Sequence, residues 1–474
     1  AVRAAYPTAE TYRFYGTQHS ASQSRPHEFM GVLNRFLAGD RMVTATAPAP
    51  LTVVFIPLLT ETGHLNPTLG LARDLARRGH RPVYLAMPEL LAQAVKQGFS
   101  GSPLFPDLPQ QAPPAGWLLS LPLLRAMREI RTKTRHFNVM MDRMLSGRVA
   151  AELHALKPDV VAVDNMWPQL AFVARRAGIP SVLLSTTPEF RADDARRCTV
   201  GTGTRVREWL LRTMFFILGL RWHQKTRRLA RECTIDSVDL KGPMPRLAGH
   251  EIPELLLYPR EIDDPSANPG RYVGPVIDVD RREPPLDLAN IPAGETLVYC
   301  ALGSRQTSAR RALALFRLII AAVARRPAHT LILAAGEHAA SLRDVPDHVR
   351  VVDKAPQLAV LSRADVMLTH GGLGSIKESL YFGVPMLVFP LRFDQEANAR
   401  RVHDRGLGVH IGRRDRTVEG IGRALDEIAA NPAYRERVKA VSDAMRALQS
   451  KAEATDFFTS LAAHPDRIHS AAKV

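Results

Sequence analysis

The sequence predicts an α/β protein of two successive Rossmann-like, doubly wound domains that face each other across a cleft. Strand-like and helix-like segments alternate from Thr52, a polar, proline-rich stretch interrupts them at 279–294, and a second alternating run begins at Thr296. Strands and helices that alternate through short turns favour parallel sheets covered by helices on both faces. Ligands of such domains bind at the carboxyl ends of the strands.

In the first domain, a run of apolar and β-branched residues predicts a buried strand, and a helical apolar period that ends at Gly79 predicts the helix after it. The same order then repeats. Strands are expected at 52–59, 81–87, 158–164 and 179–186, with helices at 66–80 and 168–178; in the second domain strands are expected at 296–304, 329–336, 349–353, 366–370 and 384–390.

Residues 1–50 lack a hydrophobic period and are expected to be disordered; a targeting peptide is the alternative, but no apolar core of a signal peptide is present. The predicted boundaries follow. They are an extension at 1–50, an acceptor-binding domain at 51–278, a linker at 279–294, a donor-binding domain at 295–440, and a helical tail at 441–474 that packs back across the cleft.

Composition and charge restrict the partners. The 474 residues include 63 Lys and Arg against 47 Asp and Glu, a net charge of +16, which suits a phosphate-bearing ligand, a nucleic acid or a membrane surface. No apolar run is long enough for a transmembrane helix. The three cysteines lie far apart, so we expect neither a disulfide framework nor a thiolate zinc site, and a reducing, cytoplasmic setting.

A glycine-rich turn in the second domain predicts an anion site. The strand at 366–370 runs into Gly371, Gly372, Leu373, Gly374 and Ser375, and a helix follows. Glycines permit close backbone approach, and the N–H groups and dipole of a helix N-terminus favour a diphosphate. A tight strand-to-helix connection without a ligand is the alternative.

The residues around this turn resemble the donor-binding signature of the UDP-dependent glycosyltransferase family, which has the GT-B fold. The matching elements are Ala-Pro-Gln at 355–357, His-Gly-Gly at 370–372, Glu378, Gly-Val-Pro-Met at 383–386, and Asp394 with Gln395. The resemblance covers most of the chain from about residue 50. The donor residues that it implies are Gly303, Ser304, Lys354, Gln357, His370, Gly371, Gly372, Gly374, Ser375, Glu378, Asp394 and Gln395.

The resemblance also implies roles. His370, Ser375 and Ser304 would approach the diphosphate, Glu378 the ribose hydroxyls, Asp394 and Gln395 the sugar hydroxyls, and Gln357 the nucleoside end. Singly, Glu378 also fits a solvated helix residue, and His370 a strand-end histidine with a structural hydrogen bond. The chain departs from the family where Lys354 replaces a base-stacking Trp and Leu373-Gly374 replaces Trp-Asn. The nucleotide therefore stays open between uridine and thymidine.

The loop after the first strand resembles the family's Gly-His-x-x-Pro element, with His64 facing the cleft. An imidazole titrates near neutral pH and can take the proton of an acceptor hydroxyl, so His64 is the predicted base. Asp164, at the end of its strand, matches the acidic partner that would orient the imidazole. The alternatives are a turn histidine before Pro67, and an aspartate that caps the helix near Trp167.

No metal and no cofactor are expected. Asp278 and Asp280 form an Asp-x-Asp sequence, but it enters the linker, far along the chain from the glycine-rich turn, and is interpreted as solvated. The charge of the leaving group would then be met by the helix N-terminus, Ser375 and His370.

An apolar helix surface followed by a basic end lies between Arg191 and Arg260. Its interpretations are a core helix, or an acceptor pocket for a lipophilic alcohol whose basic end rests on anionic lipid. The residues are Trp209, Leu210, Leu211, Met214, Phe215, Ile217 and Leu218, then Arg221, Lys225, Arg227, Arg228 and Arg231.

These features together predict an inverting, metal-independent glycosyltransferase that moves a hexose, with UDP-glucose as the expected donor, to a hydroxyl of a lipophilic small molecule. The alternatives are a non-catalytic nucleotide-sugar-binding partner protein and a transferase acting on a membrane lipid or sterol. An NAD-dependent oxidoreductase is disfavoured because no Gly-x-Gly-x-x-Gly follows the first strand. No nucleic-acid partner is expected. The predicted location is the cytoplasm, with peripheral contact to the inner face of the membrane as a further interpretation.

Overall fold

The computed structural model describes residues 49–58, 62–108, 123–188, 202–236, 238–239, 246–247, 251–263, 270–274, 276–289, 291, 294–303, 309–391, 394–451 and 453–463. The extension predicted for residues 1–50 lies almost wholly outside the described residues, as does the end of the predicted tail. The structural statements that follow concern the described part of the chain.

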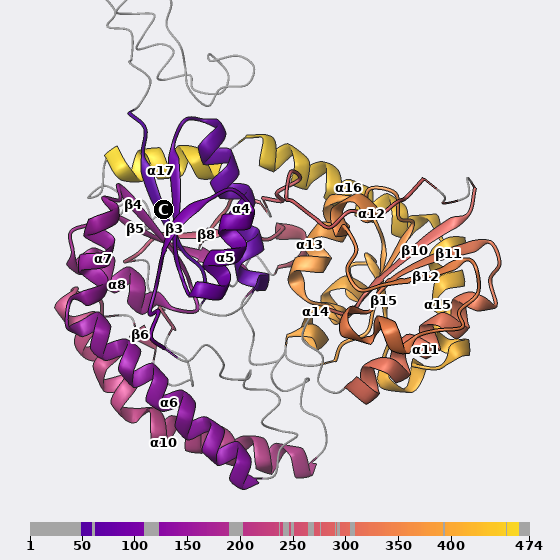
Figure 1. Cartoon of the computed structure of the whole chain (residues 1–474), viewed down its shortest axis with the longest axis horizontal. Helices are drawn as coiled ribbons and strands as arrows, with labels where there is room; N and C mark the ends of the chain where they lie inside the picture. The colour runs from indigo at the N-terminus through magenta and orange to yellow at the C-terminus, as the bar shows by residue number, and fades with distance from the viewer. Residues whose placement is uncertain are drawn as a thin grey trace, which may run out of the picture.

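The first domain is built on a seven-stranded parallel sheet with the strand order β3-β2-β1-β4-β5-β8-β9 (Figure 1). Its strands are β1 (Thr52–Ile56), β2 (Arg81–Ala86), β3 (Ser100–Pro103), β4 (Val160–Asp164), β5 (Ser181–Ser185), β8 (Glu254–Leu256) and β9 (Arg271–Tyr272). Its helices are α4 (Thr62–Arg77), α5 (Pro88–Lys96), α6 (Leu123–Leu145), α7 (Arg148–Leu156), α8 (Pro168–Arg176) and α10 (Thr202–Glu232), with η2 at Arg260–Ile262. A small antiparallel pair, β6 (Val238–Asp239) and β7 (Arg246–Leu247), lies apart from this sheet.

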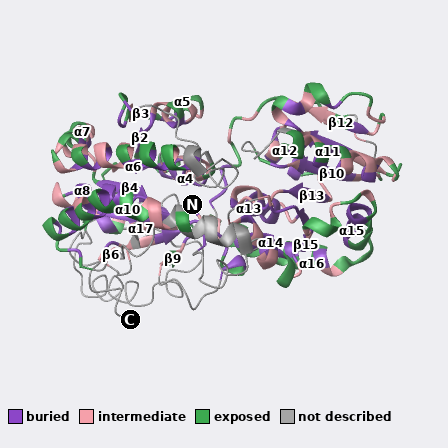
Figure 2. Cartoon of the chain, turned by 90° about the horizontal axis from the view of Figure 1, so that it is seen from below, coloured by how far each residue is buried: buried purple, intermediate pink, exposed green. Residues whose placement is uncertain are grey.

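The second domain has a six-stranded parallel sheet in the order β12-β11-β10-β13-β14-β15. Its strands are β10 (Thr296–Ala301), β11 (His329–Ala334), β12 (Val349–Val352), β13 (Val366–Thr369), β14 (Met386–Val388) and β15 (Gly408–His410). Its helices are α11 (Ala309–Ala324), α12 (Gln357–Leu361), α13 (Leu373–Tyr381), α14 (Gln395–Asp404), α15 (Val418–Ala430) and α16 (Pro432–Ser450), with η3 at Gly336–Ser341 and η4 at Arg413–Asp415. Figure 2 shows the central strands of both sheets buried beneath helices with exposed outer faces, whereas β3, at one edge of the first sheet, is mostly exposed.

Each sheet changes direction of winding at one pair of neighbouring strands. In the first domain β1 pairs with β4, with Val54 beside Val161; in the second β10 pairs with β13, with Cys300 beside Leu368. The crevice at the carboxyl end of such a pair is where ligands of open α/β sheets bind. The residues after these four strands therefore form the candidate site.

The chain returns to the first domain at its end. Helix α17 (Glu453–Ala463) packs against α4 and β4 (Figure 1). Phe458 is fully buried in the core of the first domain, and Thr455 donates a hydrogen bond to Asp74 on α4 (2.6 Å). The C-terminal helices therefore join the two domains.

Helix α10 is buried on one face and exposed on the other. Trp222 is fully buried against α6, whereas Phe216, Ile217 and Leu220 are exposed. The interpretation as a core helix therefore describes only its inner face, and the side chains of Trp209 and Leu211 lie outside the described residues. Within the described chain, no helix has the length and apolar character needed to cross a bilayer.

A buried lysine joins the two domains. Lys377 on α13 is 1% exposed, and its Nζ donates a hydrogen bond to the carbonyl of Leu257 (2.8 Å), just after β8 of the first domain. Burial lowers the pKa of Lys377 to about 7, although the neighbouring charge of Glu378 opposes this. The boundary between the domains thus contains an amine that loses its charge within the neutral pH range.

Lys377→Met should reduce the dependence of stability on pH. Between the folded pKa of about 7 and the ordinary value of 10.5, the unfolded chain holds a proton that the folded chain has lost. The free energy of unfolding of the wild type therefore rises with pH across this window. Urea unfolding at several pH values between 7 and 10 measures the slope, with exposed Lys439→Met as the control. Equal slopes in the Lys377→Met variant and the wild type would contradict the assignment.

Candidate active site

A histidine and an aspartate meet at the switch point of the first domain. His64 lies in the first turn of α4, shortly after β1, and Asp164 ends β4. His64 Nδ1 is 2.7 Å from Asp164 Oδ2, and the two side chains are 17% and 2% exposed. The carboxylate fixes the orientation of the imidazole and favours the tautomer with hydrogen on Nδ1, which places the lone pair on Nε2.

Thr186 is a third member of this group that the sequence analysis missed. It directly follows β5, the neighbour of β4, and its Oγ1 is 2.7 Å from His64 Nδ1. The signal available in the sequence was a hydroxyl at the carboxyl end of the adjacent parallel strand. Thr186 is buried, so its hydroxyl is a fixed neighbour of the imidazole.

Asp164 does not cap the following helix. The N-cap of α8 is Trp167, which makes no side-chain cap hydrogen bond. The second carboxylate oxygen of Asp164 instead accepts a hydrogen bond from the backbone N–H of Met166 (3.0 Å). Its two oxygens therefore divide between the local turn and His64, which holds the carboxylate in place while it orients the ring.

The glycine-rich turn brings His370 against two glycines. A Cβ at Gly303 would lie 2.7 Å from the Cε1 atom of His370, and one at Gly372 would lie 2.5 Å from its Nε2. Because no real Cβ comes so close, larger residues at either position would displace the ring. The backbone φ angles of Gly371 and Gly303 are +86° and +79°, in a region that residues with a side chain rarely adopt. The predicted Ser304 lies outside the described residues.

The start of α13 is an anion-binding feature. The helix begins at Leu373, and Ile376 N–H donates the first helical bond to Gly372 (3.1 Å). The N–H groups of Leu373, Gly374 and Ser375 precede that bond, and Ser375 is half-buried in the first turn. Such N–H groups and the helix dipole favour phosphate oxygens. Helix α13 packs against α4, the helix whose first turn carries His64 (Figure 1).

Asp394 and Gln395 lie at the start of α14, on the same side as His64. Burial raises the pKa of Asp394 above its ordinary value, although a hydrogen bond from Asn398 and the nearby His64 oppose this. Asn398 Nδ2 donates both to Asp394 Oδ2 (2.9 Å) and to the carbonyl of Gly371 (3.0 Å), which ties the carboxylate to the glycine-rich turn. Gln395 is buried, and its Oε1 accepts a hydrogen bond from Leu391 N–H (2.9 Å).

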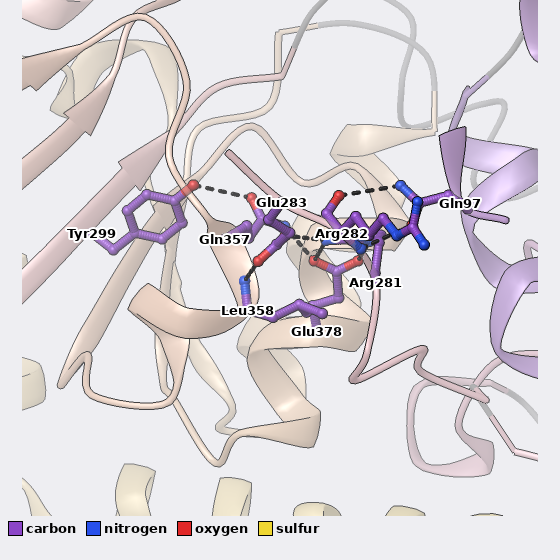
Figure 3. A network of polar contacts seen from close by, with 8 residues as sticks. All are labelled: Gln97, Arg281, Arg282, Glu283, Tyr299, Gln357, Leu358 and Glu378. Carbon is purple, nitrogen blue, oxygen red and sulfur yellow. Dashed lines mark hydrogen bonds and ion pairs between the residues drawn. The ribbon is translucent and has the colours of Figure 1, made fainter. Parts of the chain in front are cut away.

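Glu378 lies in a network of polar contacts (Figure 3). Its carboxylate accepts two hydrogen bonds from Arg281 and one from Gln357 Nε2 (2.6 Å). Burial alone would lower the pKa of Arg281, but the charges and hydrogen bonds of Glu378 and Glu283 raise it above its ordinary value. Glu378 is therefore not a solvated helix residue. The other position expected near the nucleoside, Lys354, is exposed.

The interpretation of Asp278 as a solvated residue is wrong. Its side chain is 2% exposed and accepts two hydrogen bonds from Arg73 on α4, from Nε (2.7 Å) and Nη2 (2.9 Å). Asp280 is exposed and pairs with Arg77. The polar composition of the linker suggested solvation because the arginines that pair with Asp278 and Asp280 lie on a helix some 200 residues earlier in the chain. Among the described residues, no group of three or more His, Cys, Asp and Glu is arranged to hold a metal ion.

Comparisons with known proteins agree with this arrangement. Residues 317–461 match the family described as the C-terminal domain of erythromycin biosynthesis protein CIII-like proteins. The chain is 26% identical to the oleandomycin glycosyltransferase of Streptomyces antibioticus over 85% of this chain and 89% of the relative. A segment of 99 residues is 36% identical to an NDP-glycosyltransferase of Bacillus subtilis, but it spans only 25% of that relative's length and 21% of this chain.

A structural relative shows the same fold. The structure of a spinosyn rhamnosyltransferase complexed with thymidine diphosphate has a TM-score of 0.59 and 19% identity to this chain, and covers 85% of this chain and 98% of its own. The chain therefore has the GT-B fold, and its relatives are natural-product glycosyltransferases. The predicted fold, family resemblance and enzyme class are confirmed.

Asp164→Asn should lower the turnover of sugar transfer by roughly 10²–10⁴-fold, because an amide no longer fixes the tautomer of His64 or balances its positive charge. Initial rates with a nucleotide sugar measure this. Asp159→Asn is the matched control, since Asp159 is exposed and accepts a hydrogen bond from the N–H of Thr52 at the other end of the sheet (2.7 Å). Wild-type turnover in the Asp164→Asn variant, with its fold intact, would contradict the role.

Proposed function

We propose that this chain transfers a hexose from a nucleoside-diphosphate sugar, UDP-glucose first among the candidates, to a hydroxyl of a lipophilic small molecule, with inversion at the anomeric carbon. The observation that carries this proposal is the 2.7 Å contact between His64 and Asp164 at the switch point of one sheet. Helix α13, whose first turn is the candidate diphosphate site, packs against α4, the helix that carries His64. A base and a diphosphate site in this relation are what the direct displacement of a diphosphate by an alcohol requires.

In the proposed reaction, the acceptor oxygen displaces the diphosphate from the anomeric carbon in a single step. His64 Nε2 takes the proton of the acceptor hydroxyl as the hydroxyl oxygen forms a bond to the anomeric carbon. The bond from that carbon to the diphosphate oxygen breaks on the opposite face, and the nucleoside diphosphate leaves with the electron pair. Asp164 stabilises the imidazolium formed by the proton transfer. Because attack and departure are in line, the configuration of the anomeric carbon inverts.

Charge on the departing diphosphate is met by groups of the second domain. The N–H groups at the start of α13, the Ser375 hydroxyl and His370 would each stabilise the phosphate oxygens as negative charge develops. Asp394 would hold sugar hydroxyls. We propose that this step needs neither a metal ion nor a cofactor.

Exposed apolar side chains on α10 support a lipophilic acceptor. Leu210, Phe216 and Ile217 are between 39% and 57% exposed, and apolar patches of this kind often mark binding sites. A membrane lipid or sterol as acceptor is the second candidate, because exposed Arg221 and Arg228 lie further along the same helix. Cytoplasmic location, with or without contact to an anionic membrane, stays a prediction.

The nucleotide is proposed as uridine or thymidine diphosphate. The spinosyn rhamnosyltransferase holds thymidine diphosphate, while the resemblance that first pointed to a donor site is to uridine-dependent enzymes. Thermal protection of the purified protein by UDP, TDP and their glucose conjugates separates the two. A non-catalytic sugar-nucleotide-binding protein would bind one of them without turnover.

His64→Ala should lower turnover by roughly 10²–10⁴-fold, the usual contribution of a positioned general base. Donor affinity should change little, because the diphosphate site lies in the other domain. Initial rates and calorimetric titration of UDP measure the two effects. Exposed His154→Ala is the control for loss of an imidazole. Near wild-type turnover in the His64→Ala variant would remove His64 from the reaction.

Activity should persist in EDTA. Asp278 and Asp280, the pair that most resembles a metal-binding sequence, already pair with Arg73 and Arg77. Turnover is compared before and after treatment with excess chelator and after addition of Mg²⁺. A reaction abolished by EDTA and restored by Mg²⁺ would contradict the metal-independent mechanism.

A further inference from the structure

Arg281 reaches the candidate ribose site from outside the donor domain. It belongs to the segment that joins the two sheets, and its side chain is 12% exposed. Nη1 donates to Glu378 Oε1 (2.7 Å), and Nη2 donates to Glu378 Oε2 (3.3 Å) and to Glu283 Oε1 (2.7 Å) (Figure 3). Two-nitrogen recognition of a carboxylate by arginine fixes its plane as well as its position.

Glu283 and Gln357 complete the support of the carboxylate. Glu283 Oε2 accepts a hydrogen bond from Leu358 N–H (2.9 Å) in the first turn of α12, so the carboxylate that binds Arg281 Nη2 is itself anchored. Gln357 Nε2 donates to Glu378 Oε2 (2.6 Å), and Gln357 Oε1 in turn accepts from the hydroxyl of Tyr299 (3.3 Å). Each neighbour of Glu378 is therefore itself held in place.

The backbone of Arg281 is fixed by the first domain. The next residue, Arg282, accepts a hydrogen bond at its carbonyl from Gln97 Nε2 (3.1 Å), and its N–H donates to Gln97 Oε1 (2.8 Å). Asp278, three residues before Arg281, pairs with Arg73. The guanidinium therefore enters the donor site from a backbone that α4 and α5 position.

The Glu378 carboxylate has only part of its hydrogen-bond acceptor capacity left for a ligand. A carboxylate has about four acceptor directions, two on each oxygen. Among the described residues, Oε2 of Glu378 accepts from Arg281 and Gln357, whereas Oε1 accepts from Arg281 alone. One direction, on Oε1, is left. In addition, the two carboxylates and one guanidinium carry a net charge of −1, which favours a hydroxyl donor over a phosphate oxygen.

We propose that Arg281 is a positioning residue of the donor site, which holds Glu378 so that its carboxylate accepts one ribose hydroxyl rather than two. This inference rests on the proposed function, in which Glu378 faces the ribose. A site of this kind gains little from the second hydroxyl of a ribose. Without Arg281, both oxygens of Glu378 regain acceptor directions and the carboxylate loses its fixed plane.

The test is calorimetric titration of UDP and 2′-deoxy-UDP, which share base and diphosphate and differ in one hydroxyl. The wild type should bind the two with dissociation constants within about threefold of each other. Arg281→Met should weaken UDP binding about tenfold or more and weaken 2′-deoxy-UDP further, so that the ratio between them rises. The control, Arg282→Met, removes a neighbouring exposed arginine whose side chain donates to Lys96 O (3.2 Å), and should match the wild type.

The role is separated from a general effect on folding in two ways. Arg281→Lys keeps the charge but not the two-nitrogen geometry, and should restore UDP affinity only in part, with KM raised more than kcat is lowered. The ratio of the dissociation constants of UDP and 2′-deoxy-UDP for the wild type is measured without any variant, so it tests the inference even if Arg281→Met does not fold. A wild type that prefers UDP tenfold or more, or an Arg281→Met variant with unchanged affinity and ratio, overturns the inference. Absence of binding by UDP, 2′-deoxy-UDP and TDP alike overturns the proposed function itself.

Discussion

The packing of α4 against α13 is the constraint on which the site depends. Each helix starts near the carboxyl edge of its own sheet, at the strand pair where the winding reverses. Because both helices run from a switch point, their contact sets the base of one domain near the anion-binding turn of the other. His64 is close enough to Asp394 to oppose the rise that burial causes in the pKa of this carboxyl group. The helix contact thus converts two separate Rossmann-like folds into one site.

Buried charges at the domain boundary are stabilised only when the domains are together. Glu378 forms an ion pair with Arg281 of the segment that joins the sheets, and Asp278 of that segment forms an ion pair with Arg73 on α4. A buried ion pair that loses one partner costs about 3–5 kcal/mol. Lys377 donates instead to the backbone carbonyl of Leu257, and no ion pair is found for it among the described residues. Burial lowers its pKa. Burial at this boundary therefore favours one arrangement of the domains.

The sequence was sufficient where a residue stands in a motif of the resembling family at the end of a strand, and insufficient where no motif marks the residue. His64, Asp164 and the turn before Ser375 follow strands whose apolar runs are visible in the sequence, so their places in the fold were predictable. Arg281 and Thr186 stand in no such motif. Their partners lie 97 residues away for Arg281 and 122 residues away for Thr186, whereas His64 and Asp164, which are 100 residues apart, were each identified by a motif. Periodicity identifies the face of a helix or strand, but it carries no information on which distant charge will meet it.

The segment between the sheets shows why a polar, aperiodic composition does not establish solvation. Successive residues in it bind alternately to the two domains: Asp280 to Arg77, Arg281 to Glu378, the backbone of Arg282 to Gln97. A rotation of one domain about this segment would have to break at least one of these pairs. A linker with such contacts resists hinge motion at this point. This segment also contacts Glu378. The same few side chains therefore determine both the relative orientation of the domains and the geometry of the donor site.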